Sequence, residues 1–318
     1  IKHRSLTLFT PANPGIPDGG FIGESKSRSL YRLQAQGEFV ARFEVIPADM
    51  AKSAKIERAE GFMHRIGRGF PVVLKPDAGQ RGTGVAVIRN RPQLDHYLGH
   101  AGGAAIIQEY VDGYEYGVFY YRYPDENEGT LFSITDKRLL TLTGDGLSTL
   151  EQLILQDERA MCMAPFHFRR HQDRLFDVPR FGERIALVEV GTHCRGALFL
   201  DGSAVSSPAL ASVIDRISKR FEGFYFGRYD IRTPSLEDFR QGRNFKIVEL
   251  NGVTSEATHI YQPGNSIWNA YRTLMRQWRI AFEIGAANRS RGVQPSSARR
   301  LLAALLPARA PHRPRPGR

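Results

Sequence analysis

Residues 245–252, with the sequence FKIVELNG, constrain the fold of this chain most strongly. The apolar Ile247, Val248 and Leu250 predict a buried β-strand. Side chains alternate between the two faces of a strand, so Glu249 and Asn251 point the same way. A carboxylate and an amide oxygen at the end of a buried strand cost free energy unless a partner compensates them. A hard cation such as Mg²⁺, which takes oxygen ligands, is one such partner.

Residues 225–232 form a second predicted strand, in which Arg228 and Asp230 share a face. If the two strands pair, Asp230, Glu249 and Asn251 converge and Arg228 stands beside them. Two interpretations stay open from these strands alone. One is a metal site, and the other is a salt bridge from Arg228 to Glu249.

The rest of the chain predicts short strands joined by hairpins, with helices between them, rather than a regular βαβ alternation. This pattern favours an α+β fold of packed lobes, and 318 residues suffice for two or three of them. No apolar run approaches the roughly 18 residues of a membrane span. The chain begins with Ile rather than Met, which leaves an upstream segment open. Its two cysteines, Cys162 and Cys194, are too few for a disulfide framework, so a reducing cytoplasm is expected.

The net charge of +11 resembles a nucleic-acid signal, but its distribution does not. Residues 289–318 hold eight arginines and no acid, which leaves +3 for residues 1–288. The Pro/Arg-rich tail 289–318 is expected to be disordered, although residues 301–306 could make two helical turns. A solvated tail is favoured over contact with RNA or an anionic membrane or partner.

A glycine-rich link joins two predicted strands. It reads GQRGTG from Gly79 to Gly84, and Lys75 ends the preceding strand. The free backbone N–H groups of such a link can cradle phosphate oxygens, and a lysine adds a point charge. The spacing matches neither a Walker P-loop nor the dinucleotide fingerprint, and a plain turn is the alternative.

Residues 106–116, IIQEYVDGYEY, follow as a strand that leaves the core into a turn. The backbone exposed at such a point can pair with the edge of an adenine, and Glu115 is placed for ribose hydroxyls. A solvent-exposed acidic hairpin is the alternative.

In their order along the chain, these motifs resemble the ATP-grasp superfamily, in particular the branch of D-alanine–D-alanine ligase, cyanophycin synthetase and the glutamate ligases. The resemblance covers about residues 24–263. It is carried by ESKSR at 24–28, the strands and link at 70–84, residues 106–116, Lys137, GDG at 144–146, RYD at 228–230 and ELN at 249–251.

The resemblance implies that two α+β lobes grip ATP and that the chain is a carboxylate–amine ligase, which forms an acyl phosphate and releases ADP and phosphate. The catalytic cations it implies are Arg228 and Lys137, or Arg138 beside the latter. It implies two Mg²⁺ ions, with Mn²⁺ as a possible substitute, on Asp230, Glu249 and Asn251. The ATP contacts that it implies are Lys26, Lys75, Gly79, Gln80, Arg81, Gly82, Thr83, Gly84, Glu109, Val111 and Glu115.

Such ligases usually begin with a Rossmann-like lobe, whereas only 25 residues precede Lys26 here, so the lobe is expected either to lie upstream of Ile1 or to be reduced to residues 10–24. The acceptor site therefore stays open, and the candidate substrate contacts are Asn13, Gly19, Gly20, Glu24, Arg195 and His259. A covering loop is the alternative for the first four, and a strand-connecting turn is the alternative for Arg195. The expected division is a reduced N-terminal segment at 1–50, a lid at 51–123, a metal-binding lobe at 124–288 and the tail.

The expected partners are a small-molecule carboxylate and an amine, such as amino acids or peptides, and no nucleic acid. Two alternatives remain: a phosphotransferase on the same scaffold, and a nucleotide-binding module whose basic tail contacts RNA or membrane. The oligomeric state is not predicted.

Overall fold

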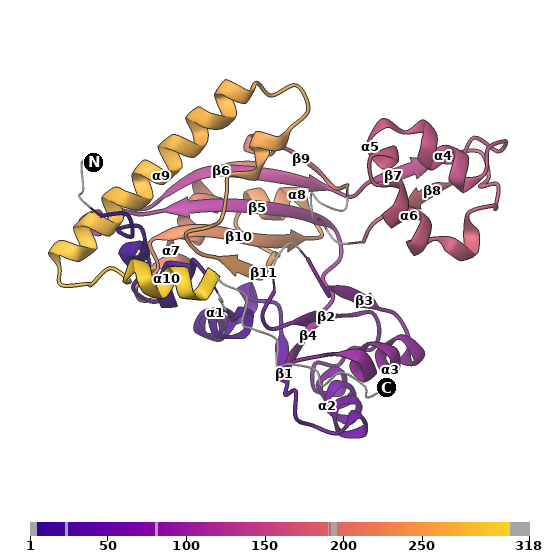
Figure 1. Ribbon diagram of the computed structural model, residues 1–318, viewed down its shortest axis with the longest axis horizontal. Coiled ribbons are helices and arrows are strands. Elements are labelled where there is room, and N and C mark those ends of the chain that lie inside the picture. The colour runs from indigo at the N-terminus through magenta and orange to yellow at the C-terminus, as the bar shows by residue number, and fades with distance from the viewer. Residues whose placement is uncertain (1–4, 23–24, 80–81, 190, 192–195, 306–318) are drawn as a thin grey trace, which may run out of the picture.

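The computed structural model describes residues 5–22, 25–79, 82–189, 191 and 196–305. In this part of the chain, helices and antiparallel strands build two larger sheets and a small third unit (Figure 1). Every strand in the sheets pairs antiparallel with its neighbours. The predicted α+β class is therefore confirmed, as is the prediction of hairpins in place of βαβ units.

The first sheet has four strands in the order β1-β4-β2-β3. Two helices cover it, and their apolar side chains at helical spacing form one core with the strands. The glycine-rich link joins β2 to the edge strand β3. The elements are β1 (Phe43–Ile46), α2 (Lys52–Arg65), β2 (Val72–Pro76), β3 (Ala86–Ile88), α3 (Arg91–His100) and β4 (Ala105–Glu109).

The second sheet has five strands in the order β11-β10-β5-β6-β9. It includes residues 114–121, which the expected division assigns to the lid; they pair with β10 and β6 over their whole length. The strands are β5 (Tyr114–Tyr121), β6 (Thr130–Arg138), β9 (Leu198–Asp201), β10 (Phe226–Thr233) and β11 (Lys246–Asn251).

The two faces of the five-stranded sheet carry different cores. One face packs its alternate residues, such as Val118 and Tyr229, against apolar side chains of α1, α7 and α8. The other face packs Phe119 and Phe226 against α9, and the polar residues of the same face continue past this core toward the first sheet. The helices are α1 (Lys26–Leu33), α7 (Pro208–Arg220), α8 (Leu236–Arg240) and α9 (Ile267–Ser290), with the 3₁₀ turns η3 (Gln34–Phe39), η6 (Ser203–Val205) and η7 (Thr258–Tyr261).

A small unit between β6 and β9 has its own core, built on Leu142, Leu150 and Ile154. Thr149 caps its first helix by accepting from the N–H group of Gln152. The unit comprises β7 (Thr141–Thr143), α4 (Leu150–Gln156), α5 (Glu158–Met161), α6 (Ala164–Arg170), η4 (Gln172–Arg174) and β8 (Arg184–Ala186).

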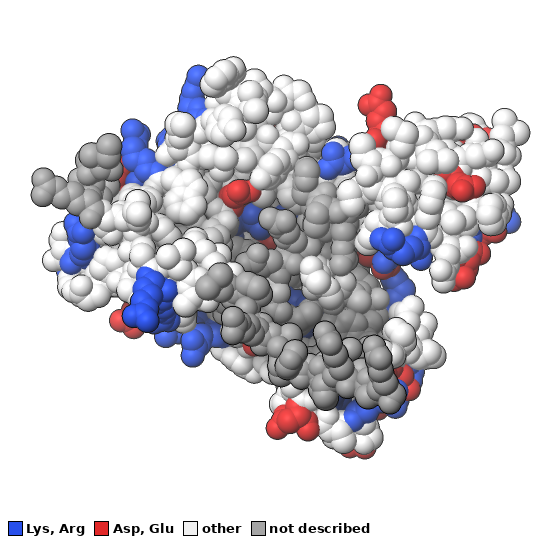
Figure 2. All heavy atoms as spheres, in the orientation of Figure 1, with Lys and Arg blue, Asp and Glu red and all other residues white. Residues whose placement is uncertain are grey.

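Part of the tail is folded, which corrects the prediction of disorder over 289–318. Helix α10 (Ala298–Leu305) buries Leu301 in the core under α9, and Arg300 pairs with Asp18 at 3.1 Å. The two predicted helical turns are therefore observed in the described part of the tail. Residues 306–318 lie outside the described residues. Basic and acidic side chains are scattered over the face shown in Figure 2.

The N-terminal segment contains the 3₁₀ turns η1 (Thr10–Ala12) and η2 (Pro17–Gly20). It lies against the end of the five-stranded sheet that is farther from the first sheet (Figure 1). Asn13 is fully buried there and is not a substrate contact, contrary to the sequence prediction. Its amide nitrogen donates to the carbonyls of Gly19 and Phe226, at 3.1 and 2.7 Å, and its oxygen accepts from the N–H groups of Tyr225 and Phe226, both at 2.9 Å. It satisfies four backbone groups that water cannot reach.

None of the described helices combines the length and apolarity needed to cross a bilayer.

We predict that Asn13→Ala lowers the free energy of unfolding by about 3 kcal/mol, because it leaves buried backbone groups unpaired. Urea denaturation measures the difference. Asn127→Ala, which changes an exposed side chain, is the matched control and should stay within about 0.5 kcal/mol. Equal stabilities of the two variants would contradict the structural role of Asn13.

Candidate active site

A cavity of about 960 Å³ lies between the two sheets. The four-stranded sheet contributes Lys75 and Gln108 to its wall, and the five-stranded sheet contributes Lys137, Asp230 and Glu249. The cavity lies along the parts of β10 and β11 that extend beyond the hydrophobic core under α9. Most of the residues that the sequence singles out line this one space.

The pairing of β10 with β11 places the predicted metal ligands together. Asp230 lies directly opposite Glu249, and Arg228 lies directly opposite Asn251. The conditional prediction that these two strands pair is confirmed.

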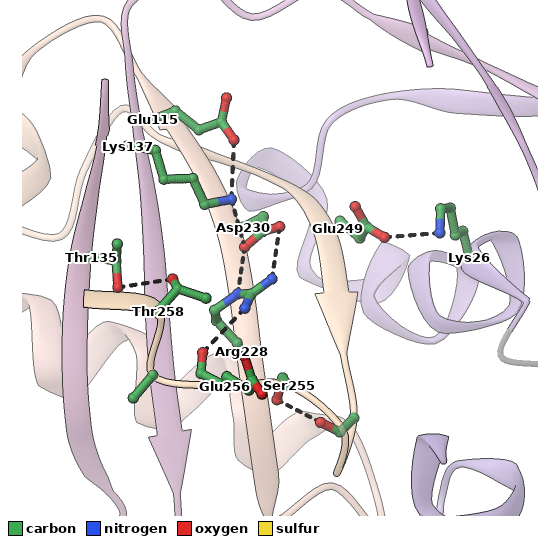
Figure 3. Close-up of polar contacts among 12 residues, drawn as sticks. Lys26, Glu115, Thr135, Lys137, Arg228, Asp230, Glu249, Ser255, Glu256 and Thr258 are labelled. Atoms are coloured by element: carbon green, nitrogen blue, oxygen red, sulfur yellow. Dashed lines mark hydrogen bonds and ion pairs between the residues drawn. The ribbon is translucent and has the colours of Figure 1, made fainter. Parts of the chain in front are cut away.

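Asp230 is the centre of the charges in this cavity. It is 8% exposed, and its Oδ1 contacts Lys137 Nζ at 3.0 Å and Arg228 Nε at 2.9 Å (Figure 3). Burial opposes ionisation, but the two cations outweigh it and hold the pKa of Asp230 well below its usual range. Asp230 is thus an anion at neutral pH.

The salt bridge from Arg228 to Glu249, the alternative left open by the sequence, is not among the ion pairs of the described residues. Arg228 pairs with Asp230 and donates to the Glu256 carbonyl at 3.1 Å. Glu249 pairs instead with Lys26 Nζ at 3.0 Å. Burial works against the charge on Arg228, but the neighbouring Asp230 raises the pKa of its guanidinium.

The donor set fits a hard divalent cation. Two carboxylates face each other across neighbouring strands, and an amide lies two residues beyond Glu249. The amide nitrogen of Asn251 is buried and has no hydrogen-bond partner among the described residues, so this side chain is not fixed by protein hydrogen bonds at that atom. No group of three or more His, Cys, Asp or Glu side chains suited to a metal occurs in the described ranges, so phosphate or water oxygens would have to complete the coordination.

Lysines from two different elements reach the same space. Lys75, on β2, is 4% exposed and donates to Gln108 Oε1 at 2.9 Å and to the Val248 carbonyl of β11 at 2.8 Å. Lys26 is the first residue of α1, behind the cap Ser25, and donates to the Gly79 carbonyl at 2.7 Å. Both lysines connect the first sheet or its link to β11.

The glycine-rich link borders the cavity through Gly79, Gly82 and Thr83. Gly82 and Gly84 adopt φ of 71° and 72°, a region that favours glycine. Gly84 lies behind the wall, where a side chain would meet the Pro76 ring at 2.6 Å. Gln80 and Arg81 lie outside the described residues.

The predicted adenine end is also part of the wall. Glu109 and Val111 border the cavity, and the Glu109 carboxylate accepts from Arg42 Nε at 2.9 Å. Glu115 contacts Lys137 Nζ at 3.1 Å. Of the two candidate cations at this position, Lys137 therefore faces the cavity, whereas Arg138 is exposed.

In the part of the chain that the structure describes, the candidate substrate contacts do not lie together. Glu24 and Arg195 lie outside them. Gly20 borders the cavity, whereas His259 does not. His259 is half-buried, and this burial lowers the pKa of its imidazole.

Two residues of the site were missed by sequence reasoning. Gln108 is a buried polar residue inside a predicted strand, which is a signal that could have found it. Gly117 lies opposite Asp230, and a side chain there would meet Arg228 Cδ at 3.1 Å. Gly117 has no sequence signal, because its role depends on the register of distant strands. Gly191, which begins the segment 191–196 that the sequence marks as a possible pocket wall or a plain turn, borders the cavity, and a side chain there would meet the Glu115 carboxylate at 2.8 Å.

Neither a protein-family model nor a curated protein matches the chain. Among solved structures, it is similar to a bifunctional glutathione synthetase from Pasteurella multocida, with 14% identity and a TM-score of 0.41. It is also similar to the VanG D-Ala:D-Ser ligase from Enterococcus faecalis, with 12% identity and a TM-score of 0.47. A third similar structure is a D-alanine–D-alanine ligase from Bacillus anthracis complexed with ATP, with 13% identity and a TM-score of 0.46.

These likenesses cover 80%, 83% and 85% of this chain, but 36%, 61% and 68% of the other chains. The chain thus spans about a third of the synthetase and about two thirds of the ligases.

We predict a pH dependence of stability that originates at Lys75. Burial lowers the pKa of its ammonium from 10.5 to about 8. Below pH 8 the lysine is charged in both the folded and the unfolded state, and its burial cost is fully present. Between pH 8 and 10.5 only the unfolded state holds the proton, so stability rises with pH.

Compared with Lys75→Met, which cannot titrate, the wild type should gain about 3 kcal/mol between pH 7.5 and pH 10.5. Urea denaturation of both proteins at the two pH values gives the difference, in which other titrating groups cancel. A constant difference would mean that Lys75 is not desolvated in the ligand-free protein.

Proposed function

We propose that the chain is an ATP-dependent carboxylate–amine ligase with an ATP-grasp fold, which releases ADP and phosphate. One observation carries the proposal. A single cavity between two α+β lobes gathers Lys26, Lys75, Lys137 and Arg228 around the carboxylates of Asp230 and Glu249.

Transfer of a phosphoryl group depends mainly on positioning and on neutralising charge. Lys75 and Lys26 lie at the glycine-rich link and would hold the triphosphate, and Gly82 and Thr83 of the link border the same space. Glu109 and Val111 would meet the adenine through their backbone, and Glu115 would meet the ribose. The terminal phosphate would then lie toward Asp230 and Arg228.

Asp230, Glu249 and Asn251 would hold two Mg²⁺ ions, with Mn²⁺ as a possible substitute. When bound, the metal neutralises the triphosphate oxygens and fixes their orientation. Lys26 now holds the carboxylate of Glu249, so it would turn toward phosphate when a metal takes that carboxylate.

Arg228 is the proposed stabiliser of the reacting carboxyl group. It is fixed by Asp230 and by the Glu256 carbonyl, and a fixed cation at a developing oxyanion is worth on the order of 3 kcal/mol. The carboxylate oxygen attacks the terminal phosphorus to give an acyl phosphate and ADP, and an amine then displaces phosphate. Both attacking groups come from substrates, so no protein nucleophile is required.

The two substrates are proposed to be a small carboxylate and an amine, such as amino acids or peptides, in a cytoplasm that supplies ATP. A phosphotransferase that stops at the phosphorylated carboxylate is the second candidate, since the same charges would serve it. A binding module without turnover is disfavoured by the complete set of cations and carboxylates.

We predict that phosphate release from ATP requires both a carboxylate and an amine. The measurement is a screen of amino acids and peptides, singly and in pairs, for ADP and phosphate. Release with carboxylates alone, unchanged by any amine, would favour the phosphotransferase over the ligase.

We also predict that Glu249→Gln lowers kcat by at least about 10³-fold while the thermal transition stays within a few degrees, because it removes a metal-binding charge and little volume. Glu60→Gln, at a surface ion pair with Arg91, is the control and should keep its activity. Full turnover of Glu249→Gln would show that the metal site is assigned to the wrong residues.

A further inference from the structure

The first half of α9 exposes an unusual set of side chains. Ile267, Trp268, Tyr271 and Met275 have 63%, 75%, 52% and 70% of their surface exposed. Large apolar side chains of this exposure, gathered on adjacent turns, mark an interaction surface rather than scattered surface residues. Figure 1 shows this end of α9 at the upper edge of the molecule.

The four side chains form one stripe. At about 100° per residue, they fall within an arc of about 100° around the helix axis. The residues that α9 buries nearest the stripe, such as Gln277 and Ile280, point to a different side. In the second half of the helix the same arc turns inward, where Trp278 and Phe282 pack beside Phe9. The four exposed side chains are therefore the uncovered first half of that arc, which we call the α9 stripe.

The charges beside the α9 stripe have one sign. Arg272, Arg276 and Arg279 lie on the neighbouring arc, and residues 257–282 contain no Asp or Glu. Arg279 approaches Glu283 at 3.9 Å, whereas Arg272 and Arg276 have no ion pair in the described part of the chain. Arg276 lies over the ring of Phe132, at 5.5 Å from its centroid.

The charge pattern decides between occupants. A second copy docked stripe to stripe would bring Arg272 and Arg276 of each chain together without an acid to compensate them, which disfavours self-association. An anionic surface compensates all of them. Exposed Trp and Tyr beside arginines are the composition of helices that lie in the headgroup region of a membrane.

We propose that the α9 stripe binds the surface of membranes that contain anionic lipids, with Trp268 and Met275 entering the headgroup region and Arg272 and Arg276 contacting lipid phosphates. The helix lies along the surface and does not cross it. Turn η7, whose Thr258 and Tyr261 border the cavity, directly precedes α9, so binding would bring the cavity close to the lipid surface. The proposal does not depend on the ligase assignment.

The test is co-sedimentation of the full chain with vesicles of phosphatidylcholine alone or with 30% phosphatidylglycerol, a composition chosen for the assay. We expect at least tenfold stronger binding to the anionic vesicles, weakened again by 0.5 M salt. Trp268→Ser/Met275→Ser and Arg272→Glu/Arg276→Glu should each lower this binding at least tenfold. Leu147→Ser/Phe181→Ser removes equally exposed apolar side chains from the small unit, 85% and 88% exposed, and should bind like the wild type.

A second readout reports on the stripe directly. The chain has two tryptophans, so Trp278→Phe leaves Trp268 as the single reporter. Its emission should shift to shorter wavelength with anionic vesicles and not with phosphatidylcholine. Absence of both the shift and sedimentation would overturn the proposal. So would a wild type that self-associates in light scattering through Trp268 and Met275, because the stripe would then be a contact between copies.

Discussion

The buried charge of Asp230 is the interaction on which the cavity depends. A lone carboxylate at this depth would be neutral or would destabilise the fold, and two cations keep it ionised. Gly117, opposite Asp230, leaves room for the stem of Arg228, since a side chain at this position would lie 3.1 Å from Arg228 Cδ. The register of three strands thus fixes a charge pattern that none of the strands specifies alone.

The same charges hold the two lobes together. Lys75 extends from β2 to the Val248 carbonyl of β11, and Lys26 joins the Gly79 carbonyl of the link to the carboxylate of Glu249. In both cases the lysine is the polar partner of a carbonyl or carboxylate that would otherwise face the open cavity. Any ligand that attracts Lys26 must therefore also change how the glycine-rich link is held.

The sequence predicted most of the local structure and most of the charged residues of the cavity wall, because strand alternation and motif order are local properties. The position of Asp230 opposite Glu249 could be predicted because each of the two strands has a clear strand pattern in its sequence. The errors came from residues whose role depends on distant contacts. Asn13 resembled a loop residue near a substrate, but it satisfies the backbone of β10. Helix α10 looked like a solvated tail because Asp18 and the core under α9, which hold it, lie far away in sequence.

The balance of charge in the cavity explains why the proposed nucleotide would have to arrive with metal. The cavity wall carries five cations and six carboxylates: Lys26, Lys75, Lys137, Arg228 and Arg232 against Glu109, Glu115, Glu189, Asp230, Glu249 and Glu256. The protein alone therefore offers little net attraction for a triphosphate of about four negative charges. Asp230 and Glu249 would hold divalent cations that compensate the added charge, and Lys26, which pairs with Glu249, would then be free to contact phosphate. A cavity that was simply basic would bind any polyanion, whereas this near-balanced one favours a metal–nucleotide pair and gives bare nucleotide or nucleic acid no comparable attraction.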